Sequence, residues 1–255
     1  MTPPIILTIA GSDSSGGAGI QADLKTIAVH GCYGASAITA LTAQNTRGVT
    51  AVHTPPVAFL AEQLRTTTSD FPPSAIKIGM LPNAECVYAV AEALRSLSCP
   101  VVLDPVMVAT SGARLAENEA VVAMREALFP LAALITPNLH EAEALCDLKI
   151  KSAADMESAA KAIGYPVLIK GGHFDSNKAS DLLYHNNSAA WLRAKRLDVG
   201  ETHGTGCTLS TAIACNLGLG HSLADSARLA KRWLTELLKT KPDLGVPNGP
   251  LMHKG

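Results

Sequence analysis

Runs of hydrophobic residues alternate with amphipathic segments along most of the chain. Six short runs are almost continuous in aliphatic and β-branched residues, a pattern typical of strands buried on both faces of a parallel sheet. These runs span residues 5–10, 35–43, 75–79, 101–104, 133–137 and 167–170. Between them, apolar residues recur at helical spacing. This spacing predicts helices over residues 57–68, 84–97, 117–128, 139–146 and 153–163.

The last third of the chain has a different pattern. Residues 180–199 contain two apolar segments joined through Asn186 and Asn187, which predicts a β-hairpin. Two further helices are expected over 205–218 and 222–239. The alternation of strands and helices predicts a three-layer α/β/α sandwich around a mostly parallel sheet. Because the sequence has no internal repeat and no long linker, we expect a single domain over residues 1–255.

Composition narrows the range of partners and compartments. Lysine and arginine (21 residues) nearly balance aspartate and glutamate (22 residues), so no strong field attracts nucleic acid. No stretch approaches the roughly 20 apolar residues of a membrane-spanning helix. The first residues lack the basic region and cleavage site of a secretion signal, and the six cysteines form no C-x-x-C pair. We therefore expect a cytoplasmic protein that binds neither nucleic acid nor a membrane, without zinc or disulfides.

A glycine-rich segment, AGSDSSGGAGIQADLKTI at residues 10–27, links the first predicted strand to an amphipathic helix. Gly16, Gly17 and Gly19 permit positive φ angles and a close approach of a ligand to the backbone. The segment has neither the G-x-x-x-x-G-K-[ST] nor the G-x-G-x-x-G pattern, so neither a Walker loop nor a dinucleotide site is indicated. From these residues alone, a serine-capped connection between a strand and a helix is an equal alternative.

Four residues that could take part in binding or catalysis lie directly after predicted strands: Gly11, Asp104, Asn138 and Lys170. Ligands of open parallel sheets bind outside the carboxyl ends of the strands, so we expect these residues to meet in one cleft. Lys170 ends an apolar run, where an unpaired ammonium is costly to bury. This position favours a role in neutralising a phosphate, and a side chain that reaches solvent is the alternative.

The segment GTGCT at residues 204–208 opens the helix expected over 205–218. Free N–H groups and the positive end of the helix dipole make such a start an anion site. The dipole also lowers the pKa of a thiol placed there, so Cys207 is a candidate general base and Thr205 a further phosphate contact. The alternative for Cys207 is a small residue that packs against the sheet.

Asn138 and Glu141 lie three residues apart at a predicted helix start, so their side chains face the same way. An N-cap asparagine followed by this glutamate is also a capping box, which requires no further function. His140, His173 and His203 lie in or near the motifs, and we assign no chemistry to them.

These motifs resemble the hydroxymethylpyrimidine kinase family of the ribokinase-like superfamily. Residues 10–27, followed by Gln44 in LTAQNT, are similar to the N-terminal signature of that family. GTGCT is similar to the anion hole of the superfamily, in which many sugar kinases have aspartate at the position of Cys207. The resemblance implies a ribokinase-like fold, ATP and Mg²⁺ as cofactors, a homodimer, and two successive phosphorylations of a small pyrimidine in thiamine biosynthesis.

The resemblance also implies a substrate pocket formed by the glycine-rich loop and the neighbouring strand ends. Asp23 and Gln44 would form hydrogen bonds with the edge of the aminopyrimidine, and Gly11 would supply backbone contacts. Met80 and Val106 would pack near the ring. A flat heterocycle needs such a slot, mostly apolar with a few polar groups that fix its orientation.

For the phosphate site, the resemblance implies that the γ-phosphate of ATP lies against Gly204, Thr205 and Gly206. Lys170 would balance its charge, and Cys207 would accept the proton of the hydroxymethyl group.

Asn138 and Glu141 match the N-x-x-E motif of the superfamily, so Asn138 would lie beside the nucleotide phosphates. Glu141 and Asp104 would then help to position magnesium, which borrows few carboxylates from a protein.

Three other functions compete with this interpretation. A pyridoxal or pyridoxine kinase acts on a similar flat aza-aromatic ring with a hydroxymethyl group. A pyrimidine-binding protein without activity can share the fold, because fold does not determine function. A Rossmann oxidoreductase is disfavoured by the missing dinucleotide fingerprint.

Overall fold

The computed structural model describes residues 2–107, 115, 117–172, 178–197, 202–242, 244 and 249–254. Within these residues, nine strands form one sheet in the order β3-β2-β1-β4-β5-β6-β7-β8-β9. The strands are β1 (Ile5–Asp13), β2 (Tyr33–Asn45), β3 (Gly48–His53), β4 (Ala75–Ile78), β5 (Val101–Leu103), β6 (Leu134–Ile135), β7 (Val167–Ile169), β8 (Lys178–His185) and β9 (Ser188–Lys195). The strands from β2 to β7 in this order pair in parallel, and β3, β8 and β9 are antiparallel at the two edges.

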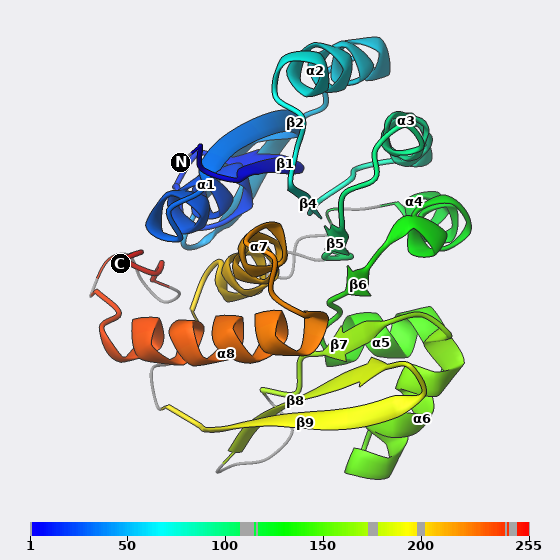
Figure 1. Ribbon diagram of the computed structural model, residues 1–255, viewed down its shortest axis with the longest axis vertical. Helices are drawn as coiled ribbons and strands as arrows, with labels where there is room; N and C mark the ends of the chain where they lie inside the picture. Colours follow the sequence, from blue (N-terminus) through cyan, green and yellow to red (C-terminus); the bar gives the residue numbers. More distant parts are fainter. Residues whose placement is uncertain are drawn as a thin grey trace.

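The helices cover both faces of the sheet. They are α1 (Gly19–Val29), α2 (Val57–Asp70), α3 (Ala84–Leu94), α4 (Asn118–Ala123), α5 (Leu139–Cys146), α6 (Ala153–Ile163), α7 (Thr205–Gly218) and α8 (Leu223–Lys239). In Figure 1, α1, α7 and α8 lie on one side of the sheet, and α2 to α6 lie on the other. The expected three-layer α/β/α sandwich with a mostly parallel sheet is therefore confirmed.

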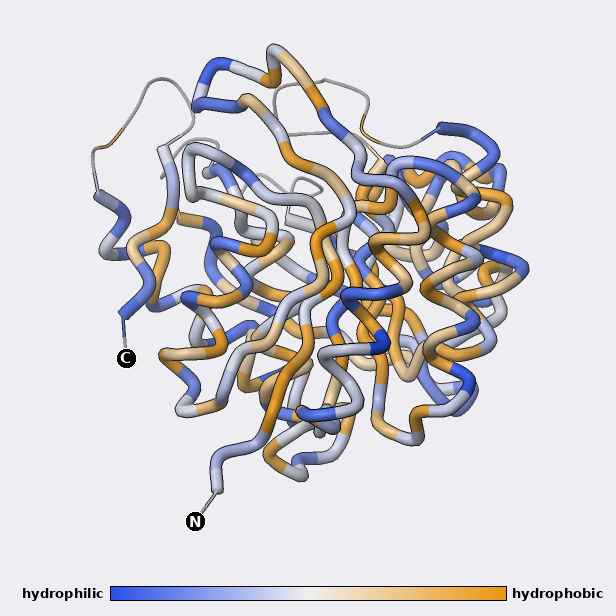
Figure 2. Tube along the Cα trace, turned by 90° about the horizontal axis from the view of Figure 1, so that it is seen from above, coloured by the Kyte–Doolittle hydropathy of each residue, from blue (hydrophilic) through white to orange (hydrophobic). Residues whose placement is uncertain are grey.

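The buried core consists of two hydrophobic layers, one on each face of the sheet. One layer joins the sheet to helices α2 to α6 and the other joins it to α1, α7 and α8. Hydrophobic stretches run through the middle of the molecule in Figure 2. Successive residues of a strand point to opposite faces. Along β4, Ile76 and Ile78 enter the first layer, whereas Ala75 enters the second, on the α7 side. Lys77 therefore points toward α1 and α7.

The predicted elements agree with the structure except at particular ends. The hairpin is confirmed: β8 and β9 join through Asn186 and Asn187, whose φ angles of 51° and 57° suit a tight hairpin turn. The helix expected over 117–128 is α4 followed by a π-helical turn at Met124–Leu128. No described helix is long and apolar enough to cross a membrane.

Strand β3 was not predicted. It is an edge strand whose residues are partly or fully exposed, so it lacks the apolar run by which buried strands are recognised. Its antiparallel pairing with β2 contains a register shift between Ala43 and Gln44. This irregularity lies at the end of β2 that carries Gln44.

Candidate active site

The early glycine-rich loop and the start of the late helix α7 are in direct contact. Gly204 is the N-cap of α7 with φ of 84°, and a Cβ atom there would collide with the carbonyl oxygen of Gly17. The N–H of Gly19 donates a hydrogen bond to the Cys207 thiol. Segments far apart in the sequence thus form one site, as the position of the motifs at strand ends predicts.

The glycine-rich loop is held in shape by the carboxylate at the end of β1. Asp13 accepts hydrogen bonds from the backbone N–H groups of Ser15, Gly17 and Ala18, at 2.8 to 3.0 Å. His203 Nε2 lies 2.8 Å from Asp13 Oδ2. Burial raises the pKa of Asp13, but the hydrogen bonds from His203 and from Ser15 outweigh it and lower this pKa to about 2. The ionised carboxylate therefore links the loop to the residue that precedes the α7 N-cap.

A second carboxylate, Asp23 on α1, forms an ion pair with Lys77 on β4 at 2.7 Å, and both side chains have zero exposure. The hydroxyls of Thr8 and Thr211 also donate to this carboxylate, at 2.6 and 2.7 Å. Burial lowers the pKa of Lys77, but the charge of Asp23 outweighs it and holds this pKa above its usual value. Each Asp23 oxygen thus accepts from Lys77 and from one threonine, because a buried lysine needs this counter-ion. The expected contact with the aminopyrimidine stays a prediction.

Cys207 lies in the first turn of α7, half-buried and close to several charged groups. Burial raises the pKa of Cys207 to about 11, although the Lys77 ammonium lowers it. Asp23 and Asp104 add to the increase. The predicted lowering of this pKa by the helix dipole is therefore wrong, because loss of hydration and two carboxylates outweigh the dipole and one ammonium.

The other side of the α7 start faces a second lysine. A Cβ atom on Gly206 would lie 3.3 Å from Lys170 Nζ and 3.6 Å from Asp104 Oδ2. Glycine at this position therefore lets the ammonium approach the first turn of the helix. The first N–H groups of a helix have no partner within the helix, so they and the Lys170 ammonium can both donate to an anion bound at this helix start. The Thr205 hydroxyl lies 3.5 Å from the carbonyl oxygen of Thr202, a long contact that a closer acceptor can replace.

Lys170 is shared between two buried carboxylates. Its Nζ atom lies 2.9 Å from Asp104 Oδ1 and 4.0 Å from Glu141 Oε2. Burial raises the pKa of Glu141 to about 7, with Lys170 opposing and Asp104 adding to the rise. Once Glu141 is ionised, two carboxylates face one ammonium, which favours binding of a cation.

Residues 13–252 match the family model described as phosphomethylpyrimidine kinase. The chain belongs to the phosphomethylpyrimidine kinase family. A hydroxymethylpyrimidine/phosphomethylpyrimidine kinase of Streptomyces coelicolor is 44% identical over 99% of this chain and 95% of its own length. The thiamine biosynthesis bifunctional protein ThiED of Geobacter sulfurreducens is 45% identical over 97% of this chain, which spans 52% of that relative. The family predicted from the motifs is thus confirmed.

Solved structures of vitamin kinases share the fold. The pyridoxal kinase of Bacillus subtilis in an ADP complex has a TM-score of 0.91 at 38% identity, covering 99% of this chain and 98% of that one. The phosphomethylpyrimidine kinase of Clostridium difficile has a TM-score of 0.80 at 42% identity, covering 91% of this chain and 98% of that one. These similarities support the ribokinase-like assignment of the sandwich.

Other residues expected in the family's pyrimidine pocket lie at the carboxyl edge of the sheet. A Cβ atom on Gly11 would lie 3.0 Å from Met80 Sδ, so these two residues are in contact. The Gln44 amide lies 3.2 Å from His203 Nε2. Val106 is partly exposed just after β5, where its N–H donates to the carbonyl of Asp104. Among these residues, Gln44 and Val106 retain exposed surface, whereas Met80 is 7% exposed.

The carboxylates fit the magnesium ion that the family implies. Asn138 caps α5 in a full capping box with Glu141, so the alternative interpretation of this motif is also realised. The cap fixes Glu141 next to Lys170 and leaves its carboxylate 6 to 7% exposed. Among the described residues, no three Asp, Glu, His or Cys side chains gather as a complete metal site. Magnesium retains waters and substrate phosphates as ligands, so two hard carboxylate oxygens suit it.

No role was assigned from the sequence to two residues that lie in the candidate site, Lys77 and His203. The argument that identified Lys170, an ammonium in an apolar strand, applies equally to Lys77 in the run 75–79. The signal for His203 was weaker, since its partner Asp13 lies 190 residues away in the sequence. Only the fold brings His203 and Asp13 together.

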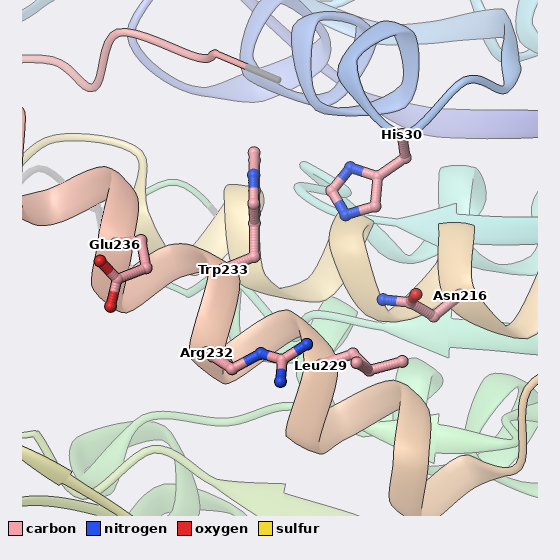
Figure 3. Close-up of a pocket in the computed structure, with 6 residues that line it drawn as sticks. All are labelled: His30, Asn216, Leu229, Arg232, Trp233 and Glu236. Atoms are coloured by element: carbon pink, nitrogen blue, oxygen red, sulfur yellow. The ribbon is translucent and has the colours of Figure 1, made fainter.

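An open pocket of about 520 Å³ lies elsewhere on the molecule (Figure 3). Its lining consists of His30, Asn216, Leu229, Arg232, Trp233 and Glu236. Asn216 lies near the carboxyl end of α7, roughly 16 Å along the helix from Thr205 at a rise of about 1.5 Å per residue. This pocket is therefore separate from the candidate active site.

Proposed function

We propose that this chain transfers the γ-phosphoryl group of ATP to 4-amino-5-hydroxymethyl-2-methylpyrimidine, and then phosphorylates the monophosphate, for thiamine biosynthesis. One observation carries the proposal: the start of α7 lies between the Lys170 corner and the glycine-rich loop with Gln44. A phosphoryl donor and a flat acceptor can therefore meet at Cys207. The names of the relatives support this pair of reactions.

Phosphoryl transfer needs alignment and charge stabilisation more than covalent chemistry. The N–H groups of Thr205, Gly206 and Cys207 would hold the γ-phosphate, and Lys170 would move from Asp104 toward its oxygens. Because the corner is buried, these charges act in a medium of low polarity and are strong. Asn138 would remain the cap that fixes Glu141, and we propose that it also borders the nucleotide.

Asp104 and Glu141 would hold Mg²⁺ beside the phosphates. When bound, the ion would neutralise charge on the phosphate oxygens. The excess negative charge around Lys170 supports this role.

The proton of the substrate alcohol would pass to the Cys207 sulfur as the alcohol oxygen attacks phosphorus. Only the thiolate can accept it, and with a pKa of about 11 the thiol is mainly protonated at neutral pH. Lys77 would stabilise the thiolate. If Cys207 is the base, the rate of the first phosphorylation should rise with pH from 7 toward 10. The second acceptor is a phosphate oxygen that is already ionised, because the second pKa of a phosphate monoester is about 6. The rate of the second phosphorylation should therefore not rise with pH.

The Cys207→Ala variant tests this asymmetry. We expect the first phosphorylation to slow by about 10²-fold or more, the usual contribution of a general base. The second phosphorylation should slow much less. Cys99→Ala is the matched control, because Cys99 precedes β5 at the amino end of the strands. Equal losses in both steps would contradict the role of Cys207 as a base.

A pyridoxal kinase is the second candidate, supported by the TM-scores of 0.91 to pyridoxal kinases. A coupled ADP-release assay on hydroxymethylpyrimidine, its monophosphate and pyridoxal separates the candidates. We expect the highest kcat/KM for the two pyrimidines. A higher value for pyridoxal would favour the second candidate, and binding without release of ADP would indicate a protein without kinase activity.

The homodimer and the cytoplasmic location are also proposals, and both rest on the family resemblance. Sedimentation velocity tests the first, with a species of twice the chain mass of 26.5 kDa as the expected result. A monomer at micromolar concentration would contradict it.

A further inference from the structure

His203 contacts two polar side chains of the proposed pyrimidine pocket through one nitrogen atom. Its Nε2 lies 2.8 Å from Asp13 Oδ2 and 3.2 Å from the Gln44 amide atom placed as Nε2. The side chains of His203 and Asp13 are 8% and 3% exposed, so water does not substitute for these contacts. The proposed mechanism uses neither His203 nor Asp13. Their arrangement nevertheless determines which atoms Gln44 presents to a ligand.

The charge of Asp13 fixes the proton on His203. The carboxylate is ionised across the neutral pH range, since its pKa is about 2, and it can only accept hydrogen bonds. His203 Nε2 therefore carries a hydrogen, whether or not Nδ1 also carries one. An amide NH₂ group facing this nitrogen would set two donors against each other. The amide as placed has its NH₂ group at this end. Since the two ends of an amide are interchangeable in shape, the reverse placement is the consistent one, with the Gln44 oxygen sharing the Nε2 hydrogen with Asp13.

The other end of the same amide gives the same answer independently. The amide atom at this end, placed as Oε1, lies 3.0 Å from Thr42 Oγ1, which itself lies 3.0 Å from the carbonyl oxygen of Ser12. A hydroxyl has one hydrogen, and the carbonyl can only accept it. The hydroxyl oxygen is thus left as an acceptor toward Gln44. The NH₂ group of Gln44 belongs at this end.

We infer that His203 and Thr42 lock Gln44 in one orientation, with its oxygen toward His203 and its NH₂ toward Thr42, and so select the aminopyrimidine edge over its oxo counterpart. The locked amide uses one lone pair and one hydrogen on the protein, which leaves one of each for a ligand. An amino group beside a ring nitrogen offers a donor and then an acceptor, and an oxo group beside a ring N–H offers the reverse order. A free glutamine can turn over to suit either edge, and a locked one cannot.

The identity of the ligand in this inference rests on the proposed function. The hydroxymethyl group must point to Cys207, so the ring cannot turn over to reverse the order of its polar atoms. His203 and Thr42 are therefore positioning residues that act through Gln44. Their loss should change selectivity, which a purely structural role would leave unchanged.

The test compares binding of 4-amino-5-hydroxymethyl-2-methylpyrimidine with binding of its 4-oxo analogue. Calorimetry without nucleotide gives the ratio of the two dissociation constants, which makes the result independent of phosphoryl transfer. We expect the wild-type chain to prefer the amino compound by about tenfold or more, because the wrong edge leaves polar groups unpaired. In His203→Phe and in Thr42→Val, this preference should fall by about tenfold.

Thr42→Ser is the control, because it keeps the hydroxyl and should keep the wild-type ratio. If His203→Phe does not fold, the Thr42→Val and Thr42→Ser pair decides alone. An unchanged ratio in Thr42→Val, or failure of both pyrimidines to bind the wild-type chain, would overturn the inference. Selective binding without ADP release in the coupled assay would leave the lock intact and refute only the proposed kinase function.

Discussion

Two lysine–aspartate pairs lie beside the start of α7, and they differ in closure and in charge. In the pair of Asp23 and Lys77, both side chains have zero exposure, and two threonine hydroxyls complete the contacts of the carboxylate. In the pair of Asp104 and Lys170, the lysine side chain is 16% exposed and a second carboxylate, Glu141, lies 4.0 Å away. The first pair is sealed and balanced, and the second is open and short of positive charge.

This difference indicates that only one pair is built to exchange partners. The sealed pair joins α1, β4 and α7, and it places a permanent positive charge near Cys207. The open pair can release its lysine to an incoming phosphate and accept a cation in return. We therefore interpret the first pair as a fixed support of the site and the second as its binding element.

The largest expected effect comes from breaking the sealed pair. Lys77→Met should lower the free energy of unfolding by about 3–5 kcal/mol, since it leaves a buried carboxylate without its counter-ion. Urea denaturation measures this loss. The double variant Lys77→Met, Asp23→Leu should recover a large part of it. Lys170→Met should destabilise the chain clearly less, and equal losses for the two lysines would remove the distinction between the pairs.

The next effect concerns activity and the open pair. Lys170→Met should lower kcat by about 10²–10³-fold, the usual result of removing one group that stabilises a transition-state charge. Steady-state kinetics with saturating ATP measures it. Lys161→Met on the exposed side of α6 is the control and should keep the wild-type rate. A Lys170→Met enzyme with normal kcat would show that the lysine does not contact the phosphates.

Another buried carboxylate sharpens the comparison, because Asp13 is held by N–H donors and a histidine instead of a lysine. Its pKa falls from 3.8 to about 2 on folding, so its stabilisation is present above pH 4 and disappears as the pH falls toward 2. The contribution is roughly 2 kcal/mol at about 1.4 kcal/mol per pKa unit. Unfolding free energies of wild-type and Asp13→Asn chains should therefore converge between pH 4 and 2. A constant difference in unfolding free energy between the two chains over this pH range would contradict this account.

The smallest expected effect comes from a change beside the open pair. Gly206→Ala adds a Cβ atom 3.3 Å from Lys170 Nζ, and the ammonium must move by a few tenths of an ångström. Because the lysine is flexible, kcat/KM should fall by at most about tenfold with little loss of stability. Kinetics together with thermal denaturation test this. A loss as large as that of Lys170→Met would mean that the helix start itself was damaged.

The architecture could be predicted from the sequence because buried parallel strands and amphipathic helices leave strong periodic signals. The six predicted strands and the hairpin all appear, and the ends of several elements differ by a few residues. Strand β3 could not be found, since an exposed edge strand does not need apolar residues. The single-domain organisation stays a prediction.

The candidate site was predictable where a motif is local, as at residues 204–208 and at Asn138 and Glu141. It was not predictable where the surroundings of a side chain determine its pKa or its partners. The pKa of Cys207 depends on Lys77, Asp23 and Asp104, which only the fold brings near it. The protein partners of Asp23 and His203, which are Lys77 and Asp13, likewise lie far apart from them in the sequence, so sequence position alone did not reveal them.

The most direct test of the central claim is a crystal structure with AMP-PCP, Mg²⁺ and hydroxymethylpyrimidine bound. The account predicts the terminal phosphate at the first N–H groups of α7, Lys170 turned toward it, and the hydroxymethyl group facing Cys207. The pyrimidine edge should contact Gln44, and Asp23 should stay paired with Lys77. A nucleotide bound away from the α7 start, or Asp23 released from Lys77 to hold the ring, would contradict it.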